Sequence, residues 1–298
     1  MLSIFRIHYP ASGLWRVAAD ERCVERQSTY GTGEMLTHAL RWGKADRVVI
    51  GLGGSATNDG GMGPAAALGF RFLGGGGLEL EPVPANLPRL EMVTPPSDLS
   101  WISGRVVAAV DVFNPLLGER GATRVYGHQK GLAGETEIRV LEAGLTRLAG
   151  VVANWRKDDL RDRRSARAAG GLGFGLMAFC GAEVRRGFDE VAELLSLAET
   201  VAGSDLIITG EGSLDAQTLE GKAPVGVAEL ARRFGKPCIA FAGRVDPASR
   251  PLLLEHFDEI TALADGAVSA AEAIRRAPEL LRVRAGELAS RWRSSLSG

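Results

Sequence analysis

The sequence has few of the residues that build disulfide frameworks, metal cages or membrane spans. Its 298 residues include 3 cysteines and 4 histidines, and no two cysteines form a CxxC pair, so neither a disulfide scaffold nor a zinc cage is indicated. Cys180 and Cys238 stand in apolar runs, where a small buried thiol is the ordinary interpretation. No uninterrupted apolar run is long enough to cross a bilayer, and the first residues lack the layout of a secretory signal. We therefore expect a cytoplasmic protein that does not use a membrane.

The chain also has almost no excess of charge of either sign. A formal net charge of -1 argues against a general electrostatic grip on nucleic acid or on an anionic membrane. Hydrophobic residues make up 45% and charged residues 24%, which is typical of folded globular proteins and argues against wholesale disorder. The length suffices for two compact α/β domains or one large domain.

Amphipathic stretches alternate with short β-branched runs along the chain. The spacing of apolar residues predicts helices over 32–45, 135–155, 170–182, 189–200 and after residue 223. Short apolar runs predict strands over 47–51, 106–112, 206–209 and 238–242. This alternation indicates an α/β fold with parallel or mixed sheets flanked by helices.

The first of three glycine-rich segments, residues 51–63, directly follows a predicted strand. Glycines let a backbone approach a ligand without a Cβ in the way, and successive amides can cradle anionic oxygens together with the hydroxyls of Ser55 and Thr57. The segment is neither a Walker A sequence nor a dinucleotide fingerprint. A tight crossover without a ligand is the alternative, but the Ser-Ala-Thr-Asn-Asp run favours an anion site.

The second segment runs from Asp111 to Gly118 and continues at residues 126–131. Asp111 stands near the carboxyl end of a predicted strand, where ligand-facing residues collect in open α/β sheets. Lys130 can offer a point charge to phosphate, although an isolated lysine is usually only solvated. The nearby cluster of Arg161, Arg163, Arg164 and Arg167 is interspersed with aspartates, so we expect a solvated linker there rather than a phosphate clamp.

The third segment, residues 209–224, is expected to form a loop that follows a strand and leads into a helix. Glu211 and Asp215 flank a glycine hinge, and Lys222 stands at the start of the next helix. Phosphoryl transfer needs such parts: oxygen ligands for Mg²⁺, a cation for the phosphates and a carboxylate for the hydroxyl proton. The alternative is that the two carboxylates cap the helix and bind loop amides.

Taken together, the three segments resemble the glycerate kinase family of the bacterial type. Its members carry GGSATNDGG, then DVxNPLxGxxGA with GPQKGA, then TGEGxxDxQTxxGKAPxGVA, in the order found here, and the similarity runs from Ala11 onward. The resemblance implies a kinase of two α/β domains that transfers the ATP γ-phosphoryl group to D-glycerate, with Mg²⁺, in a cleft between its lobes.

The resemblance also carries ligand-site roles onto individual positions of this chain. The candidate binding residues are Gly53, Gly54, Ser55, Thr57, Asn58, Asp111, Asn114, Gln129, Lys130, Gly210 and Gly212. We assign Asp215 or Asp59 as the proton acceptor and Glu211 as a Mg²⁺ ligand. Lys222 and Lys130 would steady phosphates or the substrate carboxylate.

The expected domain plan is a remnant of an N-terminal region over 1–24, a first lobe over 25–200 and a Rossmann-like lobe over 201–298. Family members begin with a further strand–loop–helix unit, so we expect this chain to lack an N-terminal segment. It departs from the family at His128, where proline is usual, and at Leu132, where alanine is usual. The family's GAGAAGG is here SARAAGG, residues 165–171.

Two other functions stay open beside the leading one. A catalytically inactive member would bind nucleotide or organic acid without transferring phosphate, and a related kinase would phosphorylate another small hydroxy acid. The hydroxyl that receives the phosphate and the oligomeric state, a homodimer included, are also open.

Overall fold

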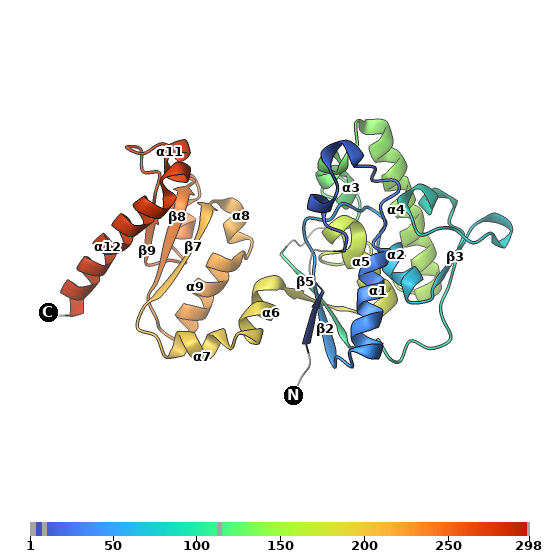
Figure 1. Ribbon diagram of the computed structural model, residues 1–298, viewed down its shortest axis with the longest axis horizontal. Coiled ribbons are helices and arrows are strands. Elements are labelled where there is room, and N and C mark those ends of the chain that lie inside the picture. The colour runs from blue at the N-terminus through green and yellow to red at the C-terminus, as the bar shows by residue number, and fades with distance from the viewer. Residues whose placement is uncertain (1–3, 8–10, 112–114, 297–298) are drawn as a thin grey trace. The chain divides into compact units, whose positions relative to one another are not determined.

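The computed structural model describes residues 4–7, 11–111 and 115–296, which fold into two compact units, Met1–Gly187 and Phe188–Gly298 (Figure 1). Each unit carries its own sheet. Within the described ranges, no helix has both the length and the apolar composition that crossing a membrane requires.

The sheet of the first unit has four parallel strands in sequential order, β1-β2-β5-β6. The strands are β1 (Ile4–Ile7), β2 (Arg47–Gly51), β5 (Val106–Val110) and β6 (Glu183–Arg186). Ile50 pairs with Ala108 and Val110 with Arg186, so the carboxyl ends of these strands meet at one edge of the sheet. The loops that leave this edge contain the first two glycine-rich segments.

Helices and a small antiparallel pair complete the first unit. They are α1 (Tyr30–Thr37) with a π-helical turn His38–Trp42, α2 (Met62–Ala67), α3 (Ala122–Tyr126), α4 (Glu135–Arg156), α5 (Ala168–Cys180), β3 (Arg71–Leu73) and β4 (Met92–Thr94). Short 3₁₀ helices cover Leu14–Arg16, Ala19–Glu21, Gly75–Gly77, Pro84–Arg89 and His128–Lys130. A Cβ on Gly61, which has φ 77° at the start of α2, would lie 2.6 Å from the Cα of Gly175 in α5. Glycine at this position therefore permits α2 to approach α5 closely.

The second unit has three parallel strands, β7 (Ile207–Leu214), β8 (Cys238–Val245) and β9 (Glu259–Ala262). Its helices are α6 (Gly187–Leu194, with Gly187 at the unit boundary), α7 (Leu197–Ala202), α8 (Ala216–Leu219), α9 (Ala223–Arg233), α10 (Arg250–Leu253), α11 (Ala270–Arg275) and α12 (Ala277–Leu296). Alternate residues of β8 belong to different apolar clusters: Ala240 packs with residues of α9, and Phe241 packs with Leu288 of α12. Helices therefore cover both faces of this sheet (Figure 1).

The predicted α/β class with parallel sheets is confirmed, and several element boundaries differ. The helix expected over 189–200 is wrong as a single element, because Ser196 adopts φ 50° and separates α6 from α7. The strand expected over 206–209 continues to Leu214, so residues 209–214 of the third glycine-rich segment are strand and not loop. The strand β1 was not predicted at all. The division into lobes at residue 200 stays a prediction. The helix α7 spans that residue, and it contacts α9 of the C-terminal unit.

Candidate active site

A segment near the N-terminus lies along the first glycine-rich loop. Gly13 forms an antiparallel bridge with Ser55, and the amide of Leu14 donates to the Gly54 carbonyl at 2.8 Å. The amide of Ala56 donates to the Ser12 carbonyl at 2.9 Å. The loop that leaves β2 is therefore flanked by residues 12–14, which sequence reasoning did not place in the site.

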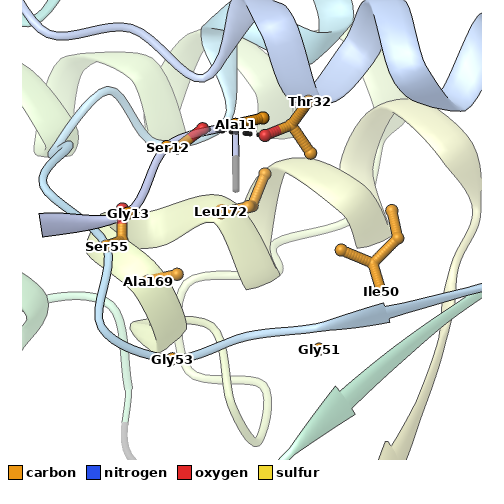
Figure 2. Close-up of a pocket in the computed structure, with 10 residues that line it drawn as sticks. All are labelled: Ala11, Ser12, Gly13, Thr32, Ile50, Gly51, Gly53, Ser55, Ala169 and Leu172. Carbon is orange, nitrogen blue, oxygen red and sulfur yellow. Dashed lines mark hydrogen bonds between the residues drawn. The ribbon is translucent and has the colours of Figure 1, made fainter. Parts of the chain in front are cut away.

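A small cavity of about 30 Å³ lies beside this pairing (Figure 2). Its lining residues are Ala11, Ser12, Gly13, Thr32, Ile50, Gly51, Gly53, Ser55, Ala169 and Leu172. The hydroxyls of Ser12 and Thr32 lie 2.8 Å apart and form its polar part, and Figure 2 shows the side chains of Ile50 and Leu172 as the apolar part. Its volume suits about two water molecules, so it can accept a small group of a ligand but not a triphosphate.

The exposed part of the first loop is short. Gly53 and Gly54 are exposed, whereas Ser55 is buried and its hydroxyl lies 2.7 Å from that of Thr57. Asp111, on the neighbouring strand end, is exposed as well, and a Cβ on Gly187 would lie 2.8 Å from its Oδ1. Gly53, Gly54 and Asp111 are therefore exposed residues at this edge of the sheet.

Asp59 lies in the interior, at 0% exposure. Its Oδ2 accepts hydrogen bonds from the amide of Thr29 at 2.7 Å, from the Thr29 hydroxyl at 2.6 Å and from the amide of Gly63 at 3.3 Å. Its Oδ1 accepts from the amide of Gly61 at 3.1 Å. Burial raises the pKa of Asp59, and these hydrogen bonds oppose that rise. Its assignment as proton acceptor stays a prediction, but the geometry favours a structural role that ties α1 to α2.

Lys130 is buried next to the same loop, at 2% exposure. Its Nζ donates to the carbonyl oxygen of Thr57 at 2.6 Å. Burial lowers the pKa of Lys130 to about 8, and the negative charge of Asp59 acts in the opposite direction. Asn58, at 1% exposure, donates from Nδ2 to the Thr123 hydroxyl at 2.9 Å. Thr57, Asn58 and Lys130 therefore form an interior polar group, and their roles as ligand contacts stay predictions.

The rest of the second segment is dispersed. Gln129 is exposed, and its backbone carbonyl accepts a hydrogen bond from Arg22 Nη1 at 3.0 Å. Asn114 lies outside the described residues. The expectation of a solvated linker is wrong for Arg167, which is 7% exposed, donates from Nη1 to the Arg120 carbonyl at 2.7 Å and lies over the ring of Tyr126.

The third segment gathers polar groups at the carboxyl end of β7. Asp215 is the N-cap of α8: its Oδ1 accepts from the amide of Gln217 at 3.0 Å, and its Oδ2 accepts from the Ser213 hydroxyl at 3.1 Å. The Thr218 hydroxyl accepts from the amide of Asp215 at 3.1 Å and donates to Glu211 Oε1. The helix-capping interpretation is therefore confirmed for Asp215. The residue is half-buried, so capping leaves its carboxylate accessible.

Arg244 was missed by sequence reasoning. It pairs with Ser213 across the parallel strands, and its Nε donates to the Ser213 hydroxyl at 3.0 Å. Ser213 thus connects Arg244 to Asp215. Arg244 stands at the carboxyl end of a correctly located strand, and the rule that ligands bind at that edge was the available signal.

The remaining predicted residues of the third segment lie close by. Lys222, at the N-cap of α9, donates from Nζ to Gln217 Oε1 at 3.3 Å. Gly212 is exposed, and a Cβ on Gly210 would lie 2.3 Å from the Phe241 carbonyl oxygen, so glycine at 210 permits the approach of β7 to β8.

The carboxylates of the third segment could hold a metal ion only together with ligands from a bound nucleotide. Nowhere in the described ranges do three or more His, Cys, Asp or Glu side chains gather in a way that could hold a metal ion. Mg²⁺ that arrives with nucleotide phosphates needs only one or two protein carboxylates. Glu211, half-buried beside Asp215, fits that requirement.

Comparison with known proteins gives a consistent result. The profile of the glycerate kinase family matches residues 9–293. A glycerate kinase of Bacillus cereus is 39% identical over 288 residues, which is 95% of this chain and 74% of that protein. The glycerate kinase of Bacillus subtilis is 38% identical over 94% of this chain and 73% of its own length. The chain therefore spans about three quarters of the length of these two relatives.

A solved structure agrees with these matches. The crystal structure of a protein assigned as glycerate kinase 2 from Salmonella typhimurium has a TM-score of 0.80 and 36% identity, over 99% of this chain and 77% of that chain. The glycerate 2-kinase of Escherichia coli is 41% identical over 78% of this chain and 61% of its own length. With a family match that covers most of its residues, the chain belongs to the glycerate kinase family.

Proposed function

We propose that this protein is a glycerate kinase that transfers the γ-phosphoryl group of ATP to a hydroxyl of D-glycerate and releases phosphoglycerate and ADP. The observation that carries the proposal is the family match over residues 9–293. The glycine-rich loop at the carboxyl edge of β2 supports it, because parallel α/β sheets bind ligands at that edge. A cytoplasmic location, where ATP is available, belongs to the same proposal.

Asp215 is the proton acceptor in this proposal. Ser213 and Gln217 each donate one hydrogen bond to a different oxygen of its carboxylate, so the group is held in one orientation. A carboxylate has about four lone-pair sites, so at least one remains for the substrate hydroxyl beside the bonds from Ser213 and Gln217 and the contact from the helix cap. The fixed carboxylate accepts the hydroxyl proton as the bond from the substrate oxygen to phosphorus forms. Asp59 is less suited, because its oxygens are enclosed and already accept four hydrogen bonds.

The remaining groups would stabilise negative charge on phosphate. The exposed residues Gly53 and Gly54 would donate their amides, and Lys222 its ammonium, to phosphate or carboxylate oxygens. Glu211 would hold Mg²⁺ through its carboxylate, with Thr218 fixing the other side of that carboxylate. When bound, Mg²⁺ neutralises charge on the β- and γ-phosphates.

The test is a direct assay of the purified protein with ATP, Mg²⁺ and D-glycerate. We expect formation of ADP that depends on both glycerate and Mg²⁺, and phosphorus NMR of the product identifies the hydroxyl that receives the phosphate. L-Glycerate and other small hydroxy acids serve as acceptor controls. Thermal stabilisation by ATP or glycerate without any ADP would overturn the proposal in favour of a binding protein. Faster turnover with another hydroxy acid would change the acceptor.

A further inference from the structure

The buried group behind the first glycine-rich loop has a feature that the proposed reaction does not use. The carbonyl oxygen of Thr57 lies between two interior elements. On one side Lys130 Nζ donates to it at 2.6 Å. On the other side a Cβ on Gly170 would lie 1.9 Å from it, so only a glycine fits there. The carbonyl is therefore held in a fixed position by one ammonium and one tight backbone contact.

Thr57 is in turn connected to the exposed end of the loop. Its amide donates to the Ser55 hydroxyl at 3.1 Å, and the hydroxyls of the two residues lie 2.7 Å apart. Ser55 follows Gly53 and Gly54, and its bridge to Gly13 aligns this end of the loop with residues 12–14. These contacts connect Thr57 to the end of the loop that carries the two exposed glycines.

We propose that Lys130 is a positioning residue: its ammonium fixes the Thr57 carbonyl from the interior and thereby sets the position of the Gly53 and Gly54 amides that bind the ligand. This inference rests on the proposed function for the identity of the ligand, ATP or glycerate. Lys130 itself touches neither, because it is enclosed on the interior side of the loop.

The cost of burying an ammonium supports a role for it. Removing an unpaired ion from water is costly, so a lysine is rarely enclosed unless it is paired. Here the compensation comes from the Thr57 carbonyl and from the negative charge of Asp59. Asp59 itself accepts from Thr29, Gly61 and Gly63, so the same pair of charges also fixes the far end of the loop.

The first experiment removes the ammonium and keeps the length of the side chain. For Lys130→Met we expect a 10- to 100-fold lower kcat, less than threefold changes in KM for ATP and glycerate, and faster hydrogen exchange at amides 53–57 only. Lys236→Met, in the second unit, is the matched control and should leave kcat and exchange in this loop unchanged. Unchanged kcat and unchanged loop exchange in Lys130→Met would overturn the proposal. If Lys130→Met does not fold, Lys130→Gln is measured instead: its side chain is shorter than that of lysine and uncharged, so kcat should fall and amides 53–57 should exchange faster, and unchanged values of both would overturn the proposal.

The second experiment uses the unmodified protein and needs no catalytic activity. Trace acetylation with acetic anhydride, followed by mass spectrometry, reports which amines are accessible. We expect Lys130 to be unreactive both with and without ATP and glycerate, and Lys236 to be labelled in both conditions. Labelling of Lys130 that ATP or glycerate suppresses would identify it as a ligand contact and overturn the proposal. If the kinase assay itself fails, labelling and loop exchange still decide the role of Lys130.

Discussion

Asp59 and Asp215 belong to similar sequence segments and occupy opposite environments. Each follows a strand within a glycine-rich, hydroxyl-rich segment. Asp59 is fully buried and accepts four hydrogen bonds, three of them from backbone amides. Asp215 is half-buried, and its oxygens accept from Ser213, from Gln217 and within the cap of a short helix. The comparison shows that a carboxylate in a glycine-rich segment can hold the loop together or serve chemistry, depending on how many of its lone pairs the protein itself uses.

The difference arises from the partners, not from the aspartates. In the first unit Thr29 reaches Asp59 from a segment thirty positions earlier in the chain and encloses it. In the second unit the Asp215 carboxylate accepts from Ser213 and Gln217, two positions away on either side, and caps a short helix. Local hydrogen bonds fix the orientation of Asp215 without covering it, which is the arrangement that a proton acceptor needs.

The largest expected effect is that of Asp215→Asn. Because asparagine also caps helices well, the free energy of unfolding should change by less than about 0.5 kcal/mol. Loss of the proton acceptor should lower kcat by about 10²- to 10⁴-fold. Steady-state kinetics and urea unfolding of the same preparation measure both quantities. Asp205→Asn, an exposed residue before β7, is the control. Near-normal turnover in Asp215→Asn would remove Asp215 from this role.

Asp59→Asn should show the reverse pattern. An amide in place of the carboxylate turns one acceptor into a donor that faces Thr29, Gly61 or Gly63, and it removes the charge that compensates Lys130. The free energy of unfolding should fall by about 3 kcal/mol. Urea unfolding measures the loss, with Asp46→Asn at an exposed position as control. A variant with unchanged stability and abolished turnover would instead make Asp59 the base.

Patterns that are local in the sequence predicted much of this fold. The β-branched run at 47–51 and the regular apolar spacing over 135–155 correspond to β2 and α4. The position of Asp111 at a strand end also follows from sequence, because its strand is a clear apolar run. Such features depend on neighbours in the chain, so propensity and periodicity are sufficient to find them.

Features that depend on residues far apart in the chain could not be predicted from local sequence patterns. Glycines disfavour strands, yet β7 continues through Gly210 and Gly212 because β8 pairs with it along its length. Ser12 and Thr32 lie outside the three glycine-rich segments and reach the cavity only through the fold. The burial of Asp59 required knowledge that Thr29 covers it.

The burial of Lys130 predicts that the free energy of unfolding depends on pH. The pKa of Lys130 is lowered to about 8 in the folded protein from 10.5. Between pH 8 and pH 10.5 Lys130 is protonated in the unfolded chain but not in the folded chain. The free energy of unfolding therefore rises with pH over this range. The gain in stability is present above pH 10.5 and is lost as the pH falls to 8. Between pH 8 and 9.5 the increment should be about 2 kcal/mol.

Urea unfolding of the unmodified protein and of Lys130→Met at both pH values measures this increment. Other titrating groups contribute to both proteins, so the difference between them isolates Lys130. The free energy of unfolding of the unmodified protein should rise relative to that of Lys130→Met. A difference that does not depend on pH would show that the ammonium is accessible to water, contrary to the enclosed geometry.

The smallest expected effect is at Ser165, where the cost is local to one residue. It adopts φ 68°, it is 0% exposed, and its hydroxyl has no hydrogen-bond partner within the described ranges. Ser165→Gly should therefore relieve both the backbone strain and the unpaired hydroxyl. After the entropy that glycine adds to the unfolded chain, the net gain should be about 1 kcal/mol in urea unfolding.

Two further variants separate the two causes in Ser165. Ser165→Ala removes the hydroxyl and keeps the strained backbone, whereas Ser196→Gly relieves a positive φ of 50° at an exposed position where water satisfies the hydroxyl. If the unpaired hydroxyl dominates, Ser165→Ala should reproduce most of the gain of Ser165→Gly, since burying an unsatisfied hydroxyl costs about 1–3 kcal/mol. If backbone strain dominates, Ser196→Gly should stabilise as much as Ser165→Gly does. A loss of stability in Ser165→Gly would mean that the packing of the serine side chain outweighs both costs.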